Sequence, residues 1–437
     1  MRVLALFVVF LVHALGGLPY MLPSFIPGGG EWVGGIAALG IGLFFTVSGA
    51  ASIFSLERRS SKQYLRERVF RLAIPFLIGG VVLVPLTIFL GPYNYDDSSW
   101  WEFWRGWAEV EPSTLSQDLD VAPIASWGSW LWVLGFLFLY AVIALPLLQW
   151  LRSENADRFI GFTTRLASRR GGLMLWVLPV ALLAMAGEYV LIALNIQPTN
   201  PELYFTFVYN GWGAFLRYLG FFVLGAILVR NRHVLNNVQR DWPISLAVLA
   251  LSVLAVLFSF SVVSDPDTGG ALLAQALVAV GSWSLAMVVM AIGQRFWNQP
   301  SRPLAYSLGI IVAFYVLHAP VIAATLRLVL DWDDQVESSA SDFTTNIFWE
   351  LWSMSPLALG AIAAVMSFVL LIAFIELMIR PIRPLRSFLG VTRDRFPGYH
   401  HSTDATNDSD TTTAEGPDPV RVHPDGRGTN DDAPTPD

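Results

Sequence analysis

Two residues near the start of the chain, Arg2 and His13, carry side chains well suited to chemistry, and they share one apolar stretch, MRVLALFVVFLVHALGGLPY. Eleven steps of an α-helix make close to three turns, so both side chains are expected on one face, about 16 Å apart along the axis. Across a hydrocarbon layer of about 30 Å, this places Arg2 at a membrane surface and His13 near the midplane. A neutral imidazole there predicts a general base acting on a hydroxyl group, and a histidine bonded only for packing is the alternative.

Two further arginines, Arg68 and Arg71, stand three positions apart in SLERRSSKQYLRERVFRLAIP, where a basic loop meets apolar sequence. At that spacing they are expected to project from one side of a helix. Guanidinium pairs suit the phosphates of a nucleotide or another polyphosphate. The alternative explanation is the general enrichment of cytoplasmic loops in basic residues, which is enough to explain the neighbouring Arg58 and Arg59. We therefore interpret Arg68 and Arg71 as candidate phosphate-binding residues.

Ser48 and Gly49 end the run GLFFTVSGA on the second apolar stretch. Small residues at such a position allow two membrane helices to pack closely. The same residues could instead admit an extended donor chain between helices. On the sequence alone, both interpretations are open.

A third set of polar residues lies inside apolar segments, in the half of the membrane opposite to Arg68. Snorkelling of long side chains explains the two arginines of this set by themselves. The clustering of all four residues favours a polar pocket instead, because ionisable groups within a membrane usually mark a functional site. The set consists of Glu188, Arg217, His318 and Arg327.

The composition is that of a membrane protein with several spans, since the chain has 437 residues, of which 54% are hydrophobic and 14% charged. The absence of cysteine excludes disulfides, thiolate metal sites and a cysteine nucleophile. Nothing in the sequence indicates nucleic-acid binding. We expect no metal site and no permanently bound cofactor.

The elements that must position these residues are predicted to be about ten transmembrane helices, which makes the protein all-α and polytopic. A secretory signal peptide is disfavoured for the first helix, since no small-residue cleavage site follows it. Arginines gather in one set of alternate loops and acidic residues in the other, so both termini are predicted to be cytoplasmic. The predicted helices cover residues 3–22, 33–54, 73–90, 129–151, 172–194, 212–229, 243–263, 271–293, 306–330 and 352–378.

Two regions outside these helices stand out by composition. Residues 398–437 contain nine acidic residues against two arginines, and so carry the whole net charge of −7; they are predicted to be a disordered cytoplasmic tail after a transmembrane domain of residues 1–384. The longest outer loop, residues 91–128, is rich in tryptophan, which indicates either an interfacial aromatic belt or a platform that stacks on sugar rings. These tryptophans are Trp100, Trp101, Trp104, Trp107 and Trp127.

Taken together, several stretches resemble the acyltransferase-3 superfamily of integral-membrane O-acyltransferases, over roughly residues 1–384. Within that family, the run PFLIGGVVLVPL and the aromatic outer loop look most like the glucans biosynthesis protein C branch. The matching stretches are the arginine and histidine at Arg2 and His13, FFTVSG, YLRERVFRLAIPFLIG, FFVLGAIL and FYVLHAP.

The resemblance implies transfer of an acyl group, acetyl or succinyl, from cytoplasmic acyl-CoA to a hydroxyl of a glycan or another extracytoplasmic acceptor. It implies that His13 is the catalytic residue, acting either as general base or as a carrier of the acyl group. It also implies a donor side formed by Arg2, Arg68 and Arg71, to which we add Ser48. The location would be the cell membrane, with membrane lipids as further partners.

A transporter or flippase for a lipid-linked or acidic sugar is the alternative from another class, because its intramembrane polar residues would line a pathway. Carboxylates spread over several helices would favour a transporter. Glu188 is the one carboxylate well inside a predicted span, and the histidine aligned with an inner arginine favours an enzyme.

Overall fold

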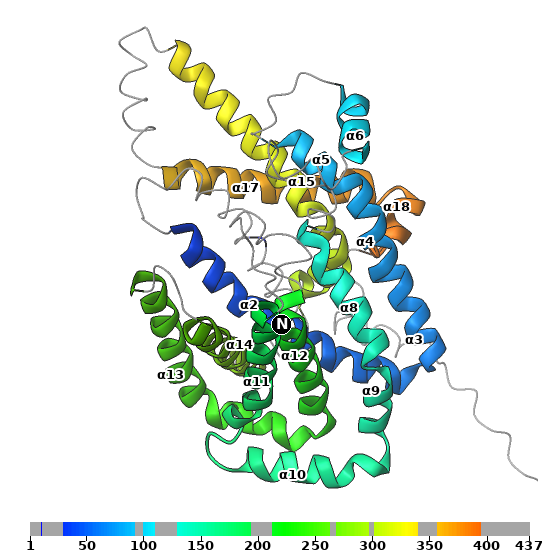
Figure 1. Ribbon diagram of the computed structural model, residues 1–437. Helices are drawn as coiled ribbons and strands as arrows, with labels where there is room; N and C mark the ends of the chain where they lie inside the picture. Colours follow the sequence, from blue (N-terminus) through cyan, green and yellow to red (C-terminus); the bar gives the residue numbers. More distant parts are fainter. Residues whose placement is uncertain are drawn as a thin grey trace, which may run out of the picture. The chain divides into compact units, whose positions relative to one another are not determined.

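The computed structural model describes residue 10 and residues 29–91, 99–109, 129–193, 212–262, 268–296, 301–339 and 356–394. Every element within these ranges is a helix, which confirms the all-α prediction (Figure 1). By its internal contacts the chain divides into residues 1–397 and residues 398–437, and all described residues belong to the first unit. The predicted acidic tail lies outside the described residues.

The longer described helices are named here in chain order, and the short turns of helix are introduced where they matter. They are α2 (Gly29–Arg58), α3 (Ser61–Arg68), α4 (Ile74–Ile78), α5 (Val84–Leu90), α6 (Trp100–Glu109), α8 (Trp132–Ile143), α9 (Leu145–Arg152), α10 (Asp157–Ser168), α11 (Leu178–Ala193), α12 (Trp212–Arg230), α13 (Arg232–Val262), α14 (Thr268–Phe296), α15 (Arg302–Ser339), α17 (Pro356–Phe374) and α18 (Arg383–Phe388).

Six helices within the described ranges are long and apolar enough to cross a membrane, which agrees with a polytopic membrane protein. A seventh span results if the bent pair α8 and α9 counts as one. The predicted number of ten remains a prediction, because residues 3–22 lie almost entirely outside the described ranges. The six helices are Leu39–Arg58, Ser61–Leu90, His233–Ala255, Gly269–Phe296, Arg302–Leu328 and Ala361–Ile379.

The third predicted helix starts earlier than the sequence pattern indicated, because helical structure begins at Ser61 rather than near residue 73. Ser60 and Gln63 form a reciprocal capping box that satisfies backbone donors at this start. Two π-helical turns, Val69–Ala73 and Gly79–Leu83, interrupt the helix.

Each of these π-helical turns ends two residues before a proline, at Pro75 and at Pro85. A proline ring crowds the carbonyl four residues earlier and gives it no N–H. The backbone widens to the next bonding pattern, in which Ile74 donates to the Val69 carbonyl and Val84 to the Gly79 carbonyl. The prolines therefore account for the two wide turns.

The fourth predicted span is broken rather than straight, since α8 and α9 meet at an angle of 54°. The break lies at Ala144, two residues before Pro146 in the first turn of α9. Because Pro146 has no N–H, the Val142 carbonyl has no helical donor, which explains a kink at this point.

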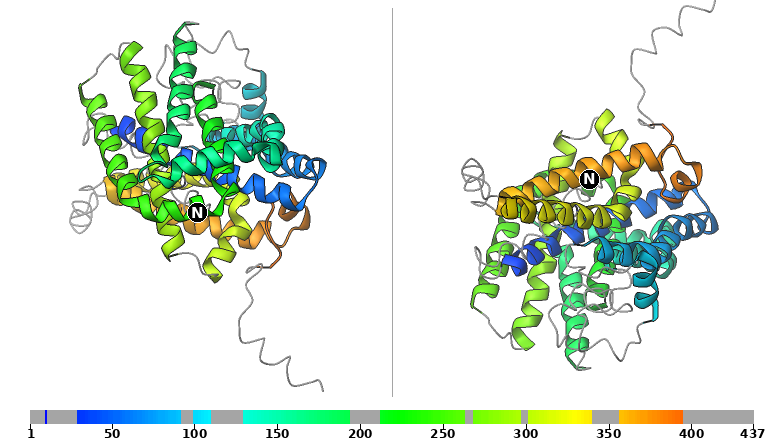
Figure 2. Two further views of the ribbon diagram at one scale, coloured as in Figure 1. Left: turned by 90° about the horizontal axis from the view of Figure 1, so that it is seen from below. Right: turned by 90° about the horizontal axis from the view of Figure 1, so that it is seen from above.

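The helices pack in two groups (Figures 1 and 2). In one group α2, α11, α12, α13 and α14 contact one another; in the other, α15 packs on α5 and α17, and α8 packs on α3 and α4. α2 and α8 connect the two groups. α2 of the first group touches α3 and α8 of the second, and α8 also touches α12 of the first. The view from above in Figure 2 shows α15 and α17 running together.

Glycines allow an especially close crossing of α2 and α12. A side chain on Gly49 would overlap the Phe222 carbonyl oxygen, and one on Gly225 would overlap the Thr46 carbonyl oxygen. The two backbones are therefore in direct contact here, as in other membrane helix pairs with small residues at the crossing. This favours the packing interpretation of Gly49, because no donor chain fits between α2 and α12 at that level.

Candidate functional site

Arg68 lies in a small polar cluster between α2 and α3. Its Nη2 donates to Ser52 Oγ at 3.3 Å, and the Tyr64 hydroxyl donates to the same oxygen at 3.1 Å. Ser52 Oγ in turn donates to the Ser48 carbonyl at 2.9 Å. The Arg68 guanidinium also lies 4.9 Å from the centre of the Tyr64 ring, within cation–π range. Tyr64 is fully buried, and Arg68 is half-buried.

This cluster links two residues that the sequence singled out, Ser48 and Arg68, through two that it did not, Ser52 and Tyr64. Arg68 has no carboxylate partner among the described residues. Ser52 occupies only one of its five N–H donors, so the guanidinium keeps donors for an anionic ligand. The cluster therefore orients a cation that remains able to bind phosphate.

Arg71 has different surroundings, although it is only three residues away. Its Nη1 lies 3.1 Å from a Glu67 oxygen, Arg59 contacts the other oxygen of the same carboxylate, and the Arg71 side chain is 62% exposed. The π-helical turn that begins at Val69 widens the helix between Arg68 and Arg71, so they diverge more than they would on an α-helix. Thus only Arg68 of the pair reaches Ser52.

Glu188 and Arg217 meet through a glutamine that joins α11, α12 and α14. Gln275 Nε2 donates to Glu188 Oε2 at 3.1 Å, and the Gln275 carbonyl oxygen accepts from Arg217. Arg217 also donates to the Tyr218 hydroxyl at 3.3 Å and lies 5.0 Å over the Tyr218 ring. Only 6% of Arg217 is exposed, whereas Glu188 and Gln275 are half-buried.

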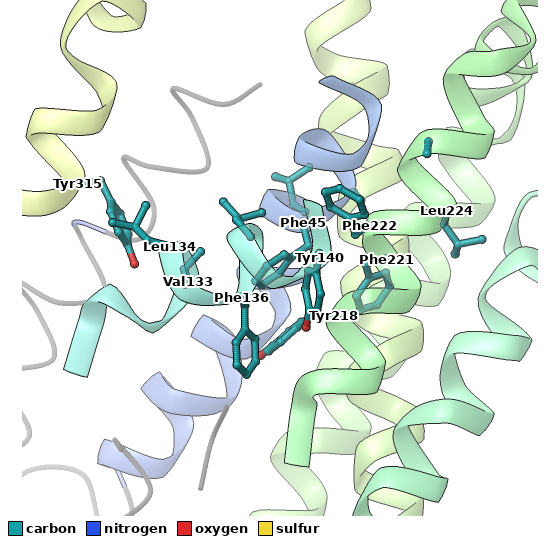
Figure 3. Close-up of a cluster of buried hydrophobic side chains, with 14 of the residues drawn as sticks. Phe45, Val133, Leu134, Phe136, Tyr140, Tyr218, Phe221, Phe222, Leu224 and Tyr315 are labelled. Atoms are coloured by element: carbon teal, nitrogen blue, oxygen red, sulfur yellow. The ribbon is translucent and has the colours of Figure 1, made fainter. Parts of the chain in front are cut away.

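An aromatic cluster lies beside this network and connects α2, α8 and α12 (Figure 3). The Phe45 ring stacks on Tyr218 at 4.8 Å, and Trp132 lies 5.5 Å from the same ring. The Tyr140 hydroxyl donates to the Phe215 carbonyl at 2.7 Å, so the phenol is satisfied within the cluster. These rings form a dense apolar partition next to Arg217.

His318 belongs to a separate cluster with Tyr315 and Trp130. Its Nδ1 lies 2.6 Å from the Tyr315 carbonyl, and since a carbonyl can only accept, Nδ1 carries the proton. The Trp130 ring lies 6.5 Å from the imidazole, and the Tyr315 hydroxyl donates to the Trp130 carbonyl. His318 is 1% exposed.

Trp130 also compensates for a proline in α15. Its indole N–H donates to the Val316 carbonyl at 3.3 Å, four residues before Pro320. That carbonyl has no helical donor, because proline lacks an N–H. The contact thus fixes Trp130 against the helix that carries His318.

Arg327 has a third set of neighbours, since its Nη1 donates to the Phe89 carbonyl at 3.4 Å, near the end of α5. A cation at a helix C-terminus interacts favourably with the free carbonyls there. Of the four residues expected to share a pocket, the structure therefore joins Glu188 and Arg217 and gives His318 and Arg327 other partners.

Arg2 and His13 lie outside the described residues. Phe10, three residues before His13 in the sequence, is described and buried. Its ring centre lies 5.3 Å from that of Phe314 and 5.7 Å from that of Phe368. Phe10 therefore contacts α15 and α17, and Phe314 is the neighbour of Tyr315 in the His318 cluster.

The outer-loop tryptophans are used partly for packing. Trp100 and Phe103 of α6 lie against Phe89, at 5.5 and 5.4 Å between ring centres. The Trp104 indole donates to the Val81 carbonyl at 3.0 Å, again four residues before a proline, Pro85. Of the loop tryptophans whose side chains are described, Trp101 is the exposed one.

Comparison with known proteins identifies the chain by family. The family model whose description is "Acyltransferase domain", for the acyltransferase-3 family, matches residues 1–376. Searches of curated proteins and of solved structures gave no significant match.

Proposed function

This chain belongs to the acyltransferase-3 family and is a membrane acyltransferase, and on that premise we propose that it moves an acyl group, acetyl or succinyl, from cytoplasmic acyl-CoA to a hydroxyl of a glycan or another extracytoplasmic acceptor. The match covers most of the chain, including every segment that carries a candidate residue. It favours an enzyme over the transporter alternative.

The observation that best supports the donor end is the position of Arg68, which is held by Ser52 and Tyr64 and has no described carboxylate partner. In the proposal, Arg68 binds a phosphate of coenzyme A by charge-assisted hydrogen bonds. Arg71 has a lesser role, because Glu67 already neutralises part of its charge. The full proposed donor side is Arg2, Ser48, Arg68 and Arg71.

In the proposed reaction His13 removes the proton of the acceptor hydroxyl. The hydroxyl oxygen attacks the thioester carbonyl carbon, the carbon–sulfur bond breaks, and coenzyme A leaves as a thiolate that takes up the proton. A polar acceptor side completes the proposal, with Glu188 and Arg217 in one group and with His318 and Arg327 contributing from separate surroundings. The contact of Phe10 with Phe314, the residue before Tyr315 in α15, supports this proposal.

The direct experiment uses the purified full chain in liposomes, supplied with radiolabelled acetyl-CoA or succinyl-CoA and a glycan extract. Transfer of label to glycan is expected for the wild type and a loss of about 100-fold or more for His13→Ala, as for removal of a general base. His233→Ala is the matched control, because His233 is exposed on α13. Wild-type transfer by His13→Ala would rule out the catalytic assignment. Movement of the label across the membrane without cleavage of the thioester would rule out the proposed acyl transfer. Mass spectrometry of surface glycans from a deletion strain would identify the acyl group and the acceptor.

A further inference from the structure

A shallow depression of about 480 Å³ lies on α3 and is separate from the Ser52–Arg68 cluster. α3 runs along the outside of the bundle in Figures 1 and 2. Tyr64 and Arg68, one turn apart, face α2, whereas the depression uses the other side of the same helix. Its lining residues are Arg59, Gln63, Arg66, Glu67 and Phe70.

The depression carries excess positive charge. Glu67 is shared by two cations, Arg59 and Arg71, so one carboxylate faces two guanidinium groups. Arg66 is exposed, has no carboxylate partner among the described residues, and lies 5.8 Å over the Phe70 ring. Residues 57–71 contain six basic residues against two acidic ones. A ligand of this depression should therefore be an anion.

The depression also continues into an apolar surface. Phe70 is 55% exposed, and further along the same span Leu77, Ile78, Val81 and Val82 are between 39% and 49% exposed. Apolar side chains on the outer surface of a membrane span face lipid chains. A ligand that fits both parts has an anionic head at the arginines and an apolar chain that begins at Phe70.

We propose that this depression binds the headgroup phosphate of an anionic phospholipid from the cytoplasmic leaflet. Arg59 and Arg66 bind the phosphate, Gln63 donates to the headgroup, and Phe70 contacts the first carbons of an acyl chain. Basic residues directly beside the cytoplasmic end of a span attract anionic lipid by about 1 kcal/mol each. The proposal does not depend on the acyltransferase reaction, since none of these residues belongs to the proposed donor side.

The test is native mass spectrometry of the full chain with phosphatidylglycerol or phosphatidylcholine. The wild type should retain phosphatidylglycerol preferentially, and Arg66→Gln should weaken that binding about fivefold. Arg295→Gln is the matched control, because Arg295 also lies over a neighbouring exposed aromatic ring, that of Phe296 at 5.6 Å, at the end of a span. Equal losses of phosphatidylglycerol binding in both variants would show that binding depends only on the general surface charge, and would overturn the proposal. Equal retention of the two lipids would also overturn it.

A second arm separates the lipid phosphate from other phosphates. Soluble coenzyme A and inorganic phosphate are added to the wild-type complex with phosphatidylglycerol, and acyl-CoA kinetics are measured for Arg66→Gln. The proposal expects the lipid to stay bound and the KM for acyl-CoA to change less than about twofold. Displacement by coenzyme A together with a raised KM would make the depression part of the donor site and overturn the lipid assignment. Displacement by inorganic phosphate alone would overturn it in favour of a general anion site.

Discussion

Two arginines of this protein lie over tyrosine rings at nearly the same distance, 4.9 Å for Arg68 over Tyr64 and 5.0 Å for Arg217 over Tyr218. Arg217 is connected to Glu188 through Gln275 and is almost fully buried. Arg68 is half-buried and is bonded to a single hydroxyl. An aromatic ring orients the cation in both places, whereas its other partners decide whether the cation ties helices together or remains available to a ligand.

The largest expected effect comes from Arg217→Leu, which tests the structural side of this comparison. Removing the cation takes a charged hydrogen bond from Gln275 and the nearby positive charge from Glu188, both of which are half-buried, so the protein should lose about 3 kcal/mol of stability. Thermal unfolding in detergent measures the loss. Adding Glu188→Gln removes the uncompensated charge and should restore part of it. A variant as stable as the wild type would contradict a role in tying α11, α12 and α14 together.

The next effect tests the binding side. Arg68→Gln should raise the KM for acyl-CoA about 30-fold, which corresponds to about 2 kcal/mol for hydrogen bonds to a charged group, with little change in stability. Arg58→Gln, on the exposed end of α2, is the control and should leave KM nearly unchanged. Charge reversal should follow the same order, with Arg68 above Arg71 and both above Arg58 and Arg59. Equal effects at all positions would mean that the loop acts only as a topology signal.

A smaller effect is expected from Tyr64→Phe, which keeps the ring and removes the bond to Ser52. The KM for acyl-CoA should rise about fivefold, as expected for one neutral hydrogen bond, while kcat stays near the wild-type value. Ser52→Ala should act similarly, and the double variant should be less than additive, because both residues hold Arg68. Tyr189→Phe, at an exposed tyrosine of α11, is the control. Additive effects would indicate that Tyr64 and Ser52 act independently.

The smallest effect is expected on deletion of residues 398–437. The Arg68 cluster, the Arg217 network and His13 all precede this tail, which is acidic, has few apolar residues and is predicted to be solvated. Activity in isolated membranes should therefore change less than about twofold. The measurement is the turnover per protein, with the level of inserted protein determined separately. A lower turnover at a normal protein level would show that the tail contributes to activity.

Much of this arrangement follows from the sequence, because the length of the apolar segments and the charge of the loops are strong local signals. They predicted the helical class and the proximity of Glu188 and Arg217, while phosphate binding by Arg68 stays a prediction. Gln275 could not be found in this way, since a neutral amide in an apolar helix has no charge signal and becomes important only once α11, α12 and α14 are paired.

The divergence of Arg68 and Arg71 could not be predicted from the sequence for a different reason. The three-residue spacing predicts one shared face only on a regular α-helix, whereas Pro75 widens the backbone into a π-helical turn between Val69 and Ala73. In a similar way, the positions of Glu188, Arg217 and Arg327 in their spans indicated similar depth in the outer half of the membrane, with His318 near the midplane. Depth alone does not determine which side chains meet. The packing of α15 on α5 brings Arg327 to the Phe89 carbonyl, whereas His318 lies beside Trp130 and Tyr315.

The two tryptophan-to-carbonyl contacts carry a consequence for how this sequence can change over time. The Trp104 indole bonds the carbonyl that Pro85 leaves without a donor, and the Trp130 indole does the same for Pro320. If Pro85 or Pro320 became alanine, the helix would supply its own N–H and displace the indole; if the tryptophan were lost first, a carbonyl would remain unsatisfied in an apolar environment. Each proline and its tryptophan should therefore be inherited as a pair, although they lie 19 and 190 positions apart in the chain.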